Sequence, residues 1–153
     1  DIAMDVIVVK HSISSPACSV MLAAAEKKAR ELGLSISVAI VDESGILKAF
    51  TRMDGAALIS IDAALKKAVT AVGFGLPTGA AWYEFIKDDP VLLHGVQSFT
   101  NFTLLGGGIA LEIGGQRVGA VGVSGGHYSH DEECAKAAVE ALYSACDPTN
   151  LST

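Results

Sequence analysis

The stretch IALEIGGQRVGAVGVSGG, residues 109–126, carries the strongest structural signal in the chain. Two apolar runs flank Gly114 and Gly115, and a Gly-Gly pair in that position predicts a β-hairpin with a two-residue turn. Gly119 and Gly122 fall inside the second strand, where glycine weakens a strand unless something approaches the backbone closely. A packed helix and a flat ligand would both satisfy this condition, and the sequence leaves both open.

A second hairpin is predicted upstream, with helices around both hairpins. The runs ISVAIV (36–41) and ILKAFTR (46–52) flank the turn residues 42–45, which have typical turn chemistry. Residues 6–9 predict a short strand. The predicted helices begin at a serine cap followed by Pro16 and end at Gly33, cover 57–72 with Gly73 and Gly75 after them, and cover about 130–145.

Helices before, between and after two hairpins predict an α+β domain with a mainly antiparallel sheet and helices packed on it. A parallel doubly wound sheet would need regular alternation of strands and helices, which the sequence lacks. The chain shows no internal repeat, linker or low-complexity segment. We therefore expect residues 1–153 to form a single domain, a size that suits one hydrophobic core.

An aromatic segment, residues 74–102, connects the two halves of the predicted fold. A short helix at about 79–87 is predicted there, with Thr78 as its N-cap and Asp88-Asp89-Pro90 ending it. Long connections often carry function, but the segment could equally be a hydrophobic cover over the sheet. It holds six of the nine aromatic residues, namely Phe74, Trp82, Tyr83, Phe85, Phe99 and Phe102.

Composition limits the classes of partner. The net charge is −6 and the Lys and Arg residues are scattered, so neither nucleic acid nor an anionic membrane is expected as a partner. Half of the residues are hydrophobic without a run long enough to span a membrane, which favours a homo-oligomer. Three cysteines, an odd number, argue against a closed disulfide framework and suggest free thiols in a reducing cytoplasm.

The GVSGG run at 122–126 matches the nucleophile elbow G-x-S-x-G of serine hydrolases. The only histidines after Ser124 are His127 and His130, which would share its turn and could not face the hydroxyl well. Ser129 and Glu132 instead predict a capping box, and the acidic residues 131–133 suit a helix N-terminus. The pair of histidines with Asp131 matches no standard ligand spacing, so no metal site is predicted.

Several blocks of the chain, in order, resemble the haem-degrading-like family, which includes GlcG-like proteins and the C-terminal domain of PduO-type proteins. The resemblance extends from about residue 6 to 145. Its carriers are Ala23–Glu26 with Ala29, VAIVDESG at 38–45, RMDGA at 52–56, KKAVTA at 66–71, the glycines 106–108, and VGAVGVSGG at 118–126.

The resemblance implies a sheet with packed helices, similar to profilin-like or PAS-like domains, and assembly into dimers or larger rings. Some members bind haem, and others look like accessory proteins or enzymes encoded among catabolic genes. Haem-binding members are similar in using a histidine near the chain start. His11 is the nearest candidate here, although the first predicted helix itself has no histidine.

The first functional hypothesis is a small-ligand-binding protein for haem or a related tetrapyrrole. Such a site needs apolar surface, an axial ligand and cations for the propionates. We expect aromatic side chains to cover a floor of glycine-bearing strands and leave space for the ligand. The candidate cofactor-binding residues are His11, Met53, Trp82, Tyr83, His94 and Phe102, and the candidate cations are Arg52, Lys66, Lys67 and Arg117.

The alternative is a catabolic enzyme of deaminase, tautomerase or hydrolase type, acting by acid–base chemistry on a small carboxylate. An arginine can clamp a carboxylate through paired hydrogen bonds, and histidine or glutamate can move protons. Ordinary ion pairs, such as Asp62 with Lys66 one helical turn apart, would explain some of the same residues. The candidate catalytic residues are Arg52, Asp54, Lys66, His94, Glu112 and His127.

Overall fold

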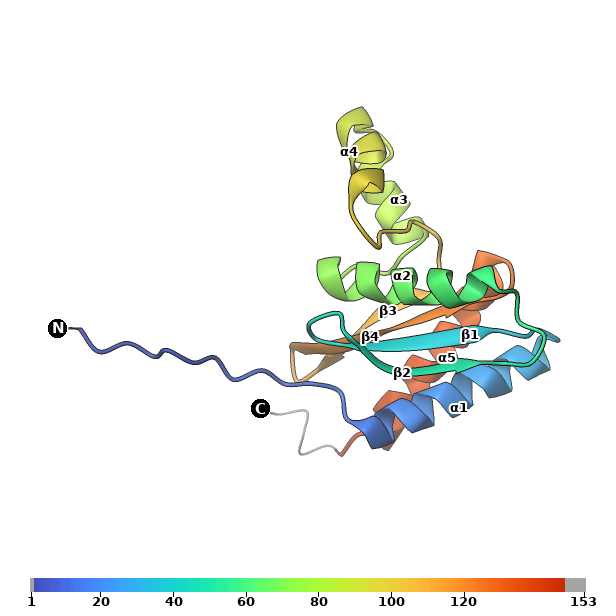
Figure 1. Cartoon of the computed structure of the whole chain (residues 1–153), viewed down its shortest axis with the longest axis horizontal. Coiled ribbons are helices and arrows are strands. Elements are labelled where there is room, and N and C mark those ends of the chain that lie inside the picture. Colours follow the sequence, from blue (N-terminus) through green and yellow to red (C-terminus); the bar gives the residue numbers. More distant parts are fainter. Residues whose placement is uncertain (1, 148–153) are drawn as a thin grey trace.

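A four-stranded antiparallel sheet forms the centre of the molecule (Figure 1). The structure is a computed structural model and describes residues 2–147. The strands are β1 (Ser37–Asp42), β2 (Leu47–Arg52), β3 (Gly108–Ile113) and β4 (Gln116–Ser124), in the order β2-β1-β4-β3. Both predicted hairpins and the α+β class are confirmed, because β1 pairs with β2 and β3 pairs with β4.

Helices cover both faces of this sheet. Helices α1 (Ser15–Glu31) and α5 (Tyr128–Ala145) pack side by side on one face, and α2 (Ile59–Phe74) lies on the other (Figure 1). The main core lies between the sheet and the α1–α5 pair. A smaller core beneath α2 uses mostly alanine and valine, which allows the helix to approach the strands closely.

The glycines of β4 allow this close approach. A Cβ added at Gly122 would lie 2.1 Å from the carbonyl oxygen of Ala64 and 2.6 Å from the amide nitrogen of Ala68, both on α2. A packed helix, and not a flat ligand, is therefore the close neighbour of this strand. The expected arrangement of a glycine floor covered by aromatic side chains was wrong, since α2 occupies that face.

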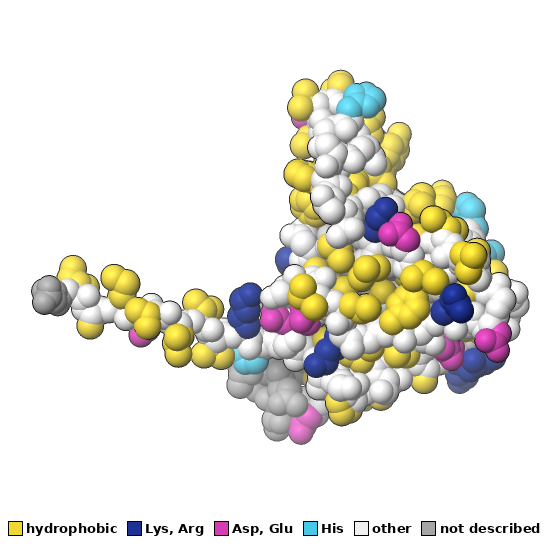
Figure 2. All heavy atoms as spheres, viewed as in Figure 1, with side chains coloured by type: hydrophobic (Ala, Val, Ile, Leu, Met, Phe, Trp, Pro, Cys, Tyr) yellow, Lys and Arg dark blue, Asp and Glu magenta, His cyan; other side chains and the backbone are white. Residues whose placement is uncertain are grey.

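The aromatic segment forms an arm that projects away from the sheet and does not cover it (Figure 1). The arm contains α3 (Ala80–Ile86), α4 (Pro90–Gly95) and a short 3-10 helix (Val96–Ser98). Trp82, Ile86 and Val96 form its own small core. Yellow hydrophobic side chains also line its surface in Figure 2.

Three local predictions were wrong. Residues 6–9 are exposed and form no strand, because no strand in the described range 2–147 pairs with them. Thr78 does not cap α3, since its Oγ1 instead accepts a hydrogen bond from Gly108 N–H. Helix α5 is capped by His127 and not by Ser129, with His127 Nδ1 accepting from the Ser129 N–H.

Within residues 2–147, each helix is too short or too polar to cross a bilayer.

Candidate functional site

An open groove of about 620 Å³ lies where three elements meet: the start of α1, the end of α5 and the β3–β4 hairpin. This volume falls within the range of about 300 to 1,000 Å³ that is typical of small-molecule sites. Its apolar wall includes Ile13, Val20, Ile113, Val118 and Leu142, and its polar groups include His11, Ser12, Gln116 and Cys146.

The chain entering α1 is fixed to the sheet at the edge of this groove. The Ile13 N–H donates to the Val118 carbonyl oxygen at 3.0 Å, and the Ile13 side chain is buried. Val118 is free to accept because the register passes from Leu111–Gly119 to Glu112–Arg117 and skips it. A β-bulge of this kind leaves the extra residue unpaired in the ladder, and here the incoming chain pairs with it. Two residues earlier, His11 therefore lies at the rim of the groove.

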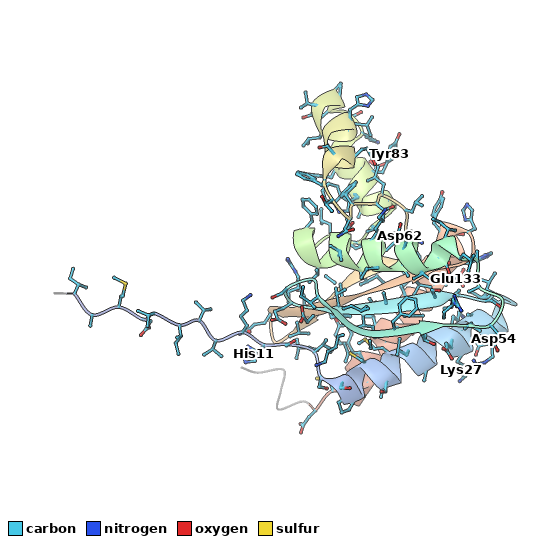
Figure 3. All side chains as sticks on the ribbon, in the orientation of Figure 1. His11, Lys27, Asp54, Asp62, Tyr83 and Glu133 are labelled. Carbon is cyan, nitrogen blue, oxygen red and sulfur yellow. The ribbon has the colours of Figure 1, made fainter. Side chains whose placement is uncertain are left out.

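His11 and Gln116 form a hydrogen bond across this rim. The contact joins His11 Nδ1 to Gln116 Oε1, although the two residues are 105 positions apart. Figure 3 shows His11 at the point where the N-terminal tail meets the body of the molecule. Gln116 is the first residue of β4 and follows the turn at Gly114 and Gly115, whose φ angles of 57° and 76° suit glycine.

The groove combines an apolar surface with one nitrogen ligand. A site of this kind can hold a flat apolar molecule and offer an axial ligand to its metal. Among residues 2–147, no Lys or Arg lines the groove. Lys10 and Arg117 are both next to lining residues in the sequence. Lys10 Nζ lies 3.4 Å from Ser44 Oγ, and Arg117 Nη1 donates to the Val72 carbonyl oxygen on α2.

A buried ion pair lies outside the groove, between α2 and α5. Lys67 Nζ is 2.9 Å from Asp131 Oδ2 and 2.8 Å from the Val123 carbonyl oxygen, and both charged side chains are 2% exposed. Asp131 Oδ1 also accepts from the Gly126 N–H at 2.9 Å. Burial lowers the pKa of Lys67, and the Asp131 carboxylate opposes that shift. Asp131 is thus a partner for a buried cation as well as a first-turn acidic residue.

A second, smaller pocket of about 210 Å³ lies near this ion pair. Thr78, Glu132, Lys136 and the glycines 107 and 108 are among its lining residues. A Cβ on Gly107 would lie 3.2 Å from Lys67 Cδ and 2.5 Å from the Val123 carbonyl oxygen. The glycines therefore allow β3 to begin directly against the buried pair.

His11 is the one predicted cofactor-binding residue among those that line the groove within residues 2–147. Met53 packs against the main core and its sulfur accepts from the Ile36 N–H at 3.5 Å. Trp82 and Phe102 pack against each other in the arm, with ring centroids 5.4 Å apart. Tyr83 and His94 are exposed on α3 and α4. Figure 3 shows Tyr83 on the arm, on the far side of α2 from His11.

The predicted catalytic residues are spread over separate elements. Within residues 2–147, no hydrogen bond or ion pair joins any two of them. Arg52 ends β2, Asp54 follows it in the next turn, and His94 lies on α4. Lys66 pairs with Asp62 at 2.9 Å, and Glu112 lies 3.9 Å from Arg117, whose Nη1 donates to the Val72 carbonyl oxygen. His127 caps α5.

The histidines near the GVSGG run form no metal cluster. Across the described part of the chain, no three or more His, Cys, Asp and Glu residues are grouped so that they could hold a metal ion. Ser124 itself is buried at the end of β4, and its N-terminal neighbour Val123 supplies the carbonyl that Lys67 contacts. The run therefore forms the junction between β4 and α5.

Known proteins resemble this chain over most of its length. GlcG of Escherichia coli K12 is 33% identical over 118 residues, covering 75% of this chain and 83% of GlcG. The corrinoid adenosyltransferase PduO of Salmonella typhimurium is 33% identical over 121 residues. That match covers 78% of this chain and 35% of PduO, so the chain spans about a third of that relative.

A solved structure also resembles this fold over most of the chain. The crystal structure of a PduOC–haem complex matches with a TM-score of 0.78 and 31% identity, covering 85% of this chain and 94% of that one. Residues 13–140 match the family described as haem degrading protein HbpS-like. The chain therefore belongs to the HbpS-like haem degrading protein family.

Proposed function

We propose that the protein binds haem or a related tetrapyrrole in the groove between α1, α5 and the β3–β4 hairpin, with His11 as the axial ligand. The observation that carries this proposal is a histidine at the rim of an apolar groove of about 620 Å³. An imidazole nitrogen is a common proximal ligand of haem iron. The apolar side chains of Val20 and Ile113, which line the groove and are at least partly exposed, would contact the macrocycle.

Two findings from relatives support the choice of ligand. A PduOC structure, 31% identical to this chain, contains haem, and the family itself is described by haem. The open side of the groove would leave the propionates in solvent. Lys10, next to His11 in the chain, could pair with one of them.

A hemin titration followed by the Soret band tests this proposal. We expect saturable binding with a sharpened, shifted Soret band, and we expect His11→Ala to weaken it more than tenfold. His94→Ala is the matched control, since His94 is an exposed histidine on α4 and should leave binding unchanged. A titration without a Soret change, or equal loss in the two variants, would contradict the proposal.

We further propose that the protein acts as a homo-oligomer, a dimer or larger ring, in the cytoplasm. Exposed apolar side chains on the arm, including Phe85 at 63% and Phe99 at 56%, favour a second copy as their cover. Free Cys18 and Cys134 suit a reducing compartment. Light scattering in solution gives the oligomer size.

A further inference from the structure

We infer that Gln116 is a positioning residue for the haem site, because it holds the His11 ring in the tautomer that leaves Nε2 free to bind iron. This inference rests on the proposed function, since it concerns the same groove. It assigns a role to a residue that itself need not touch the ligand. The observation behind it is the hydrogen bond between His11 Nδ1 and Gln116 Oε1.

The chemistry of the two atoms fixes the direction of this bond. Gln116 Oε1 is a carbonyl oxygen and can only accept, so His11 Nδ1 must carry the proton. A neutral imidazole has one protonated nitrogen, and the other nitrogen, Nε2, then keeps its lone pair. Histidines that bind metals commonly donate the other ring N–H to an oxygen acceptor in this way. Gln116 would serve as that acceptor.

The hydrogen bond is not needed to hold the chain in place. The backbone bond from Ile13 to Val118 and the buried Ile13 side chain already fix the chain before α1. His11 and Gln116 are both exposed, and a hydrogen bond between exposed groups adds little to folding stability. Its main effect is on the orientation and tautomer of the His11 ring.

The hairpin gives the acceptor a fixed position. The turn at Gly114 and Gly115 joins β3 and β4 through only two residues, and Ile113 pairs directly with Gln116. Val118, which holds the backbone of Ile13, lies two residues further along the same strand. Both anchors of the histidine segment therefore belong to β4, so the ligand would be oriented before haem arrives. Such preorganisation strengthens binding by reducing the entropy lost on association.

The first measurement uses the haem-free protein and reads the tautomer of His11 from imidazole nitrogen NMR. We expect the Nδ1–H form in the unmodified protein and a shift toward the Nε2–H form in Gln116→Leu. Gln97→Leu is the matched control, since Gln97 is the only other glutamine in the chain and is exposed on the arm. A dominant Nε2–H form in the unmodified protein, or no change in Gln116→Leu, would overturn the inference.

The second measurement is hemin affinity and reduction potential. Loss of the acceptor in Gln116→Leu should weaken binding about 10- to 100-fold, the usual effect of removing an outer-shell partner of a ligating histidine. Gln116→Glu should restore affinity and make the reduction potential more negative, because a carboxylate increases the electron density on the ring. Tight binding that is equal in Gln116→Leu and the unmodified protein would overturn the inference while the proposed function stands. If hemin does not bind at all, the proposed function fails, and the tautomer measurement still decides the role of Gln116.

Discussion

Replacing Lys67 by methionine should strongly destabilise the protein, because it leaves the Asp131 carboxylate buried without its cation. Asp131 would keep one partner, the Gly126 N–H, and the Val123 carbonyl oxygen would lose its donor. Breaking a buried ion pair by removing one partner costs about 3–5 kcal/mol. We expect a loss of this size in the free energy of unfolding.

The neighbouring lysine provides the control. Lys66 lies on the same helix and forms an ion pair with Asp62 at the same 2.9 Å, but its side chain is 37% exposed and that of Asp62 is 56% exposed. Exposed pairs one helical turn apart contribute only about 0.3–0.5 kcal/mol. Lys66→Met should therefore cost roughly a tenth of what Lys67→Met costs, although the two pairs have equal lengths.

Urea denaturation at pH 7, followed by far-UV circular dichroism, measures both losses. Lys67→Met should lower the midpoint with little change in the slope m. Adding Asp131→Asn to Lys67→Met should cost less than the sum of the two single changes, because the buried charge is then removed. A loss below about 1 kcal/mol in Lys67→Met, or a loss equal to that of Lys66→Met, would refute the reasoning about burial.

Two further predictions concern packing and pH. Gly122→Ala should lower the free energy of unfolding by about 3 kcal/mol, because the added Cβ would overlap the α2 backbone. Gly73→Ala places its Cβ where no other atom lies within 4 Å, and should stabilise α2 by up to about 1 kcal/mol. Equal effects of the two variants on the melting temperature would contradict this prediction. Burial raises the pKa of Cys134 from 9.0 to about 11, and the negative charge of the nearby Asp131 contributes to the same shift. Between these pH values the thiol ionises in the unfolded chain but not in the folded protein. The free energy of unfolding should therefore fall by roughly 2–3 kcal/mol as the pH rises from 9 to 11. Urea titrations at several pH values should show a shallower fall for Cys134→Ala.

Local signals in the sequence were enough to predict most of the fold. The turns at 42–45 and at Gly114-Gly115 fixed both hairpins, because their chemistry depends on a few adjacent residues. The run at 6–9 has the composition of a strand, but strand formation needs a neighbour that the sequence does not specify. Asp89-Pro90 ended one predicted helix and in fact also begins α4, with Asp89 as its N-cap.

The site was harder to predict because its parts are far apart in the chain. Lys67 and Asp131 are 64 residues apart, and no spacing rule links an inward-facing lysine on one helix to an acid on another. The groove is lined by residues from three separate stretches of the chain, 11–20, 113–118 and 142–147. His11 was a candidate because of its place near the chain start, whereas Gln116 had no signal of its own. Only the β4 bulge and the hairpin turn bring the two together.

Paramagnetic broadening in the proton–nitrogen NMR spectrum tests the haem site most directly. Ferric hemin broadens amide signals close to its iron, and zinc protoporphyrin serves as the diamagnetic control. We predict that hemin selectively removes the signals of Ser12, Gln116, Leu142 and Cys146 and leaves those of α3 and α4 intact. Broadening centred on the arm, or none at the groove under saturating hemin, would contradict the account.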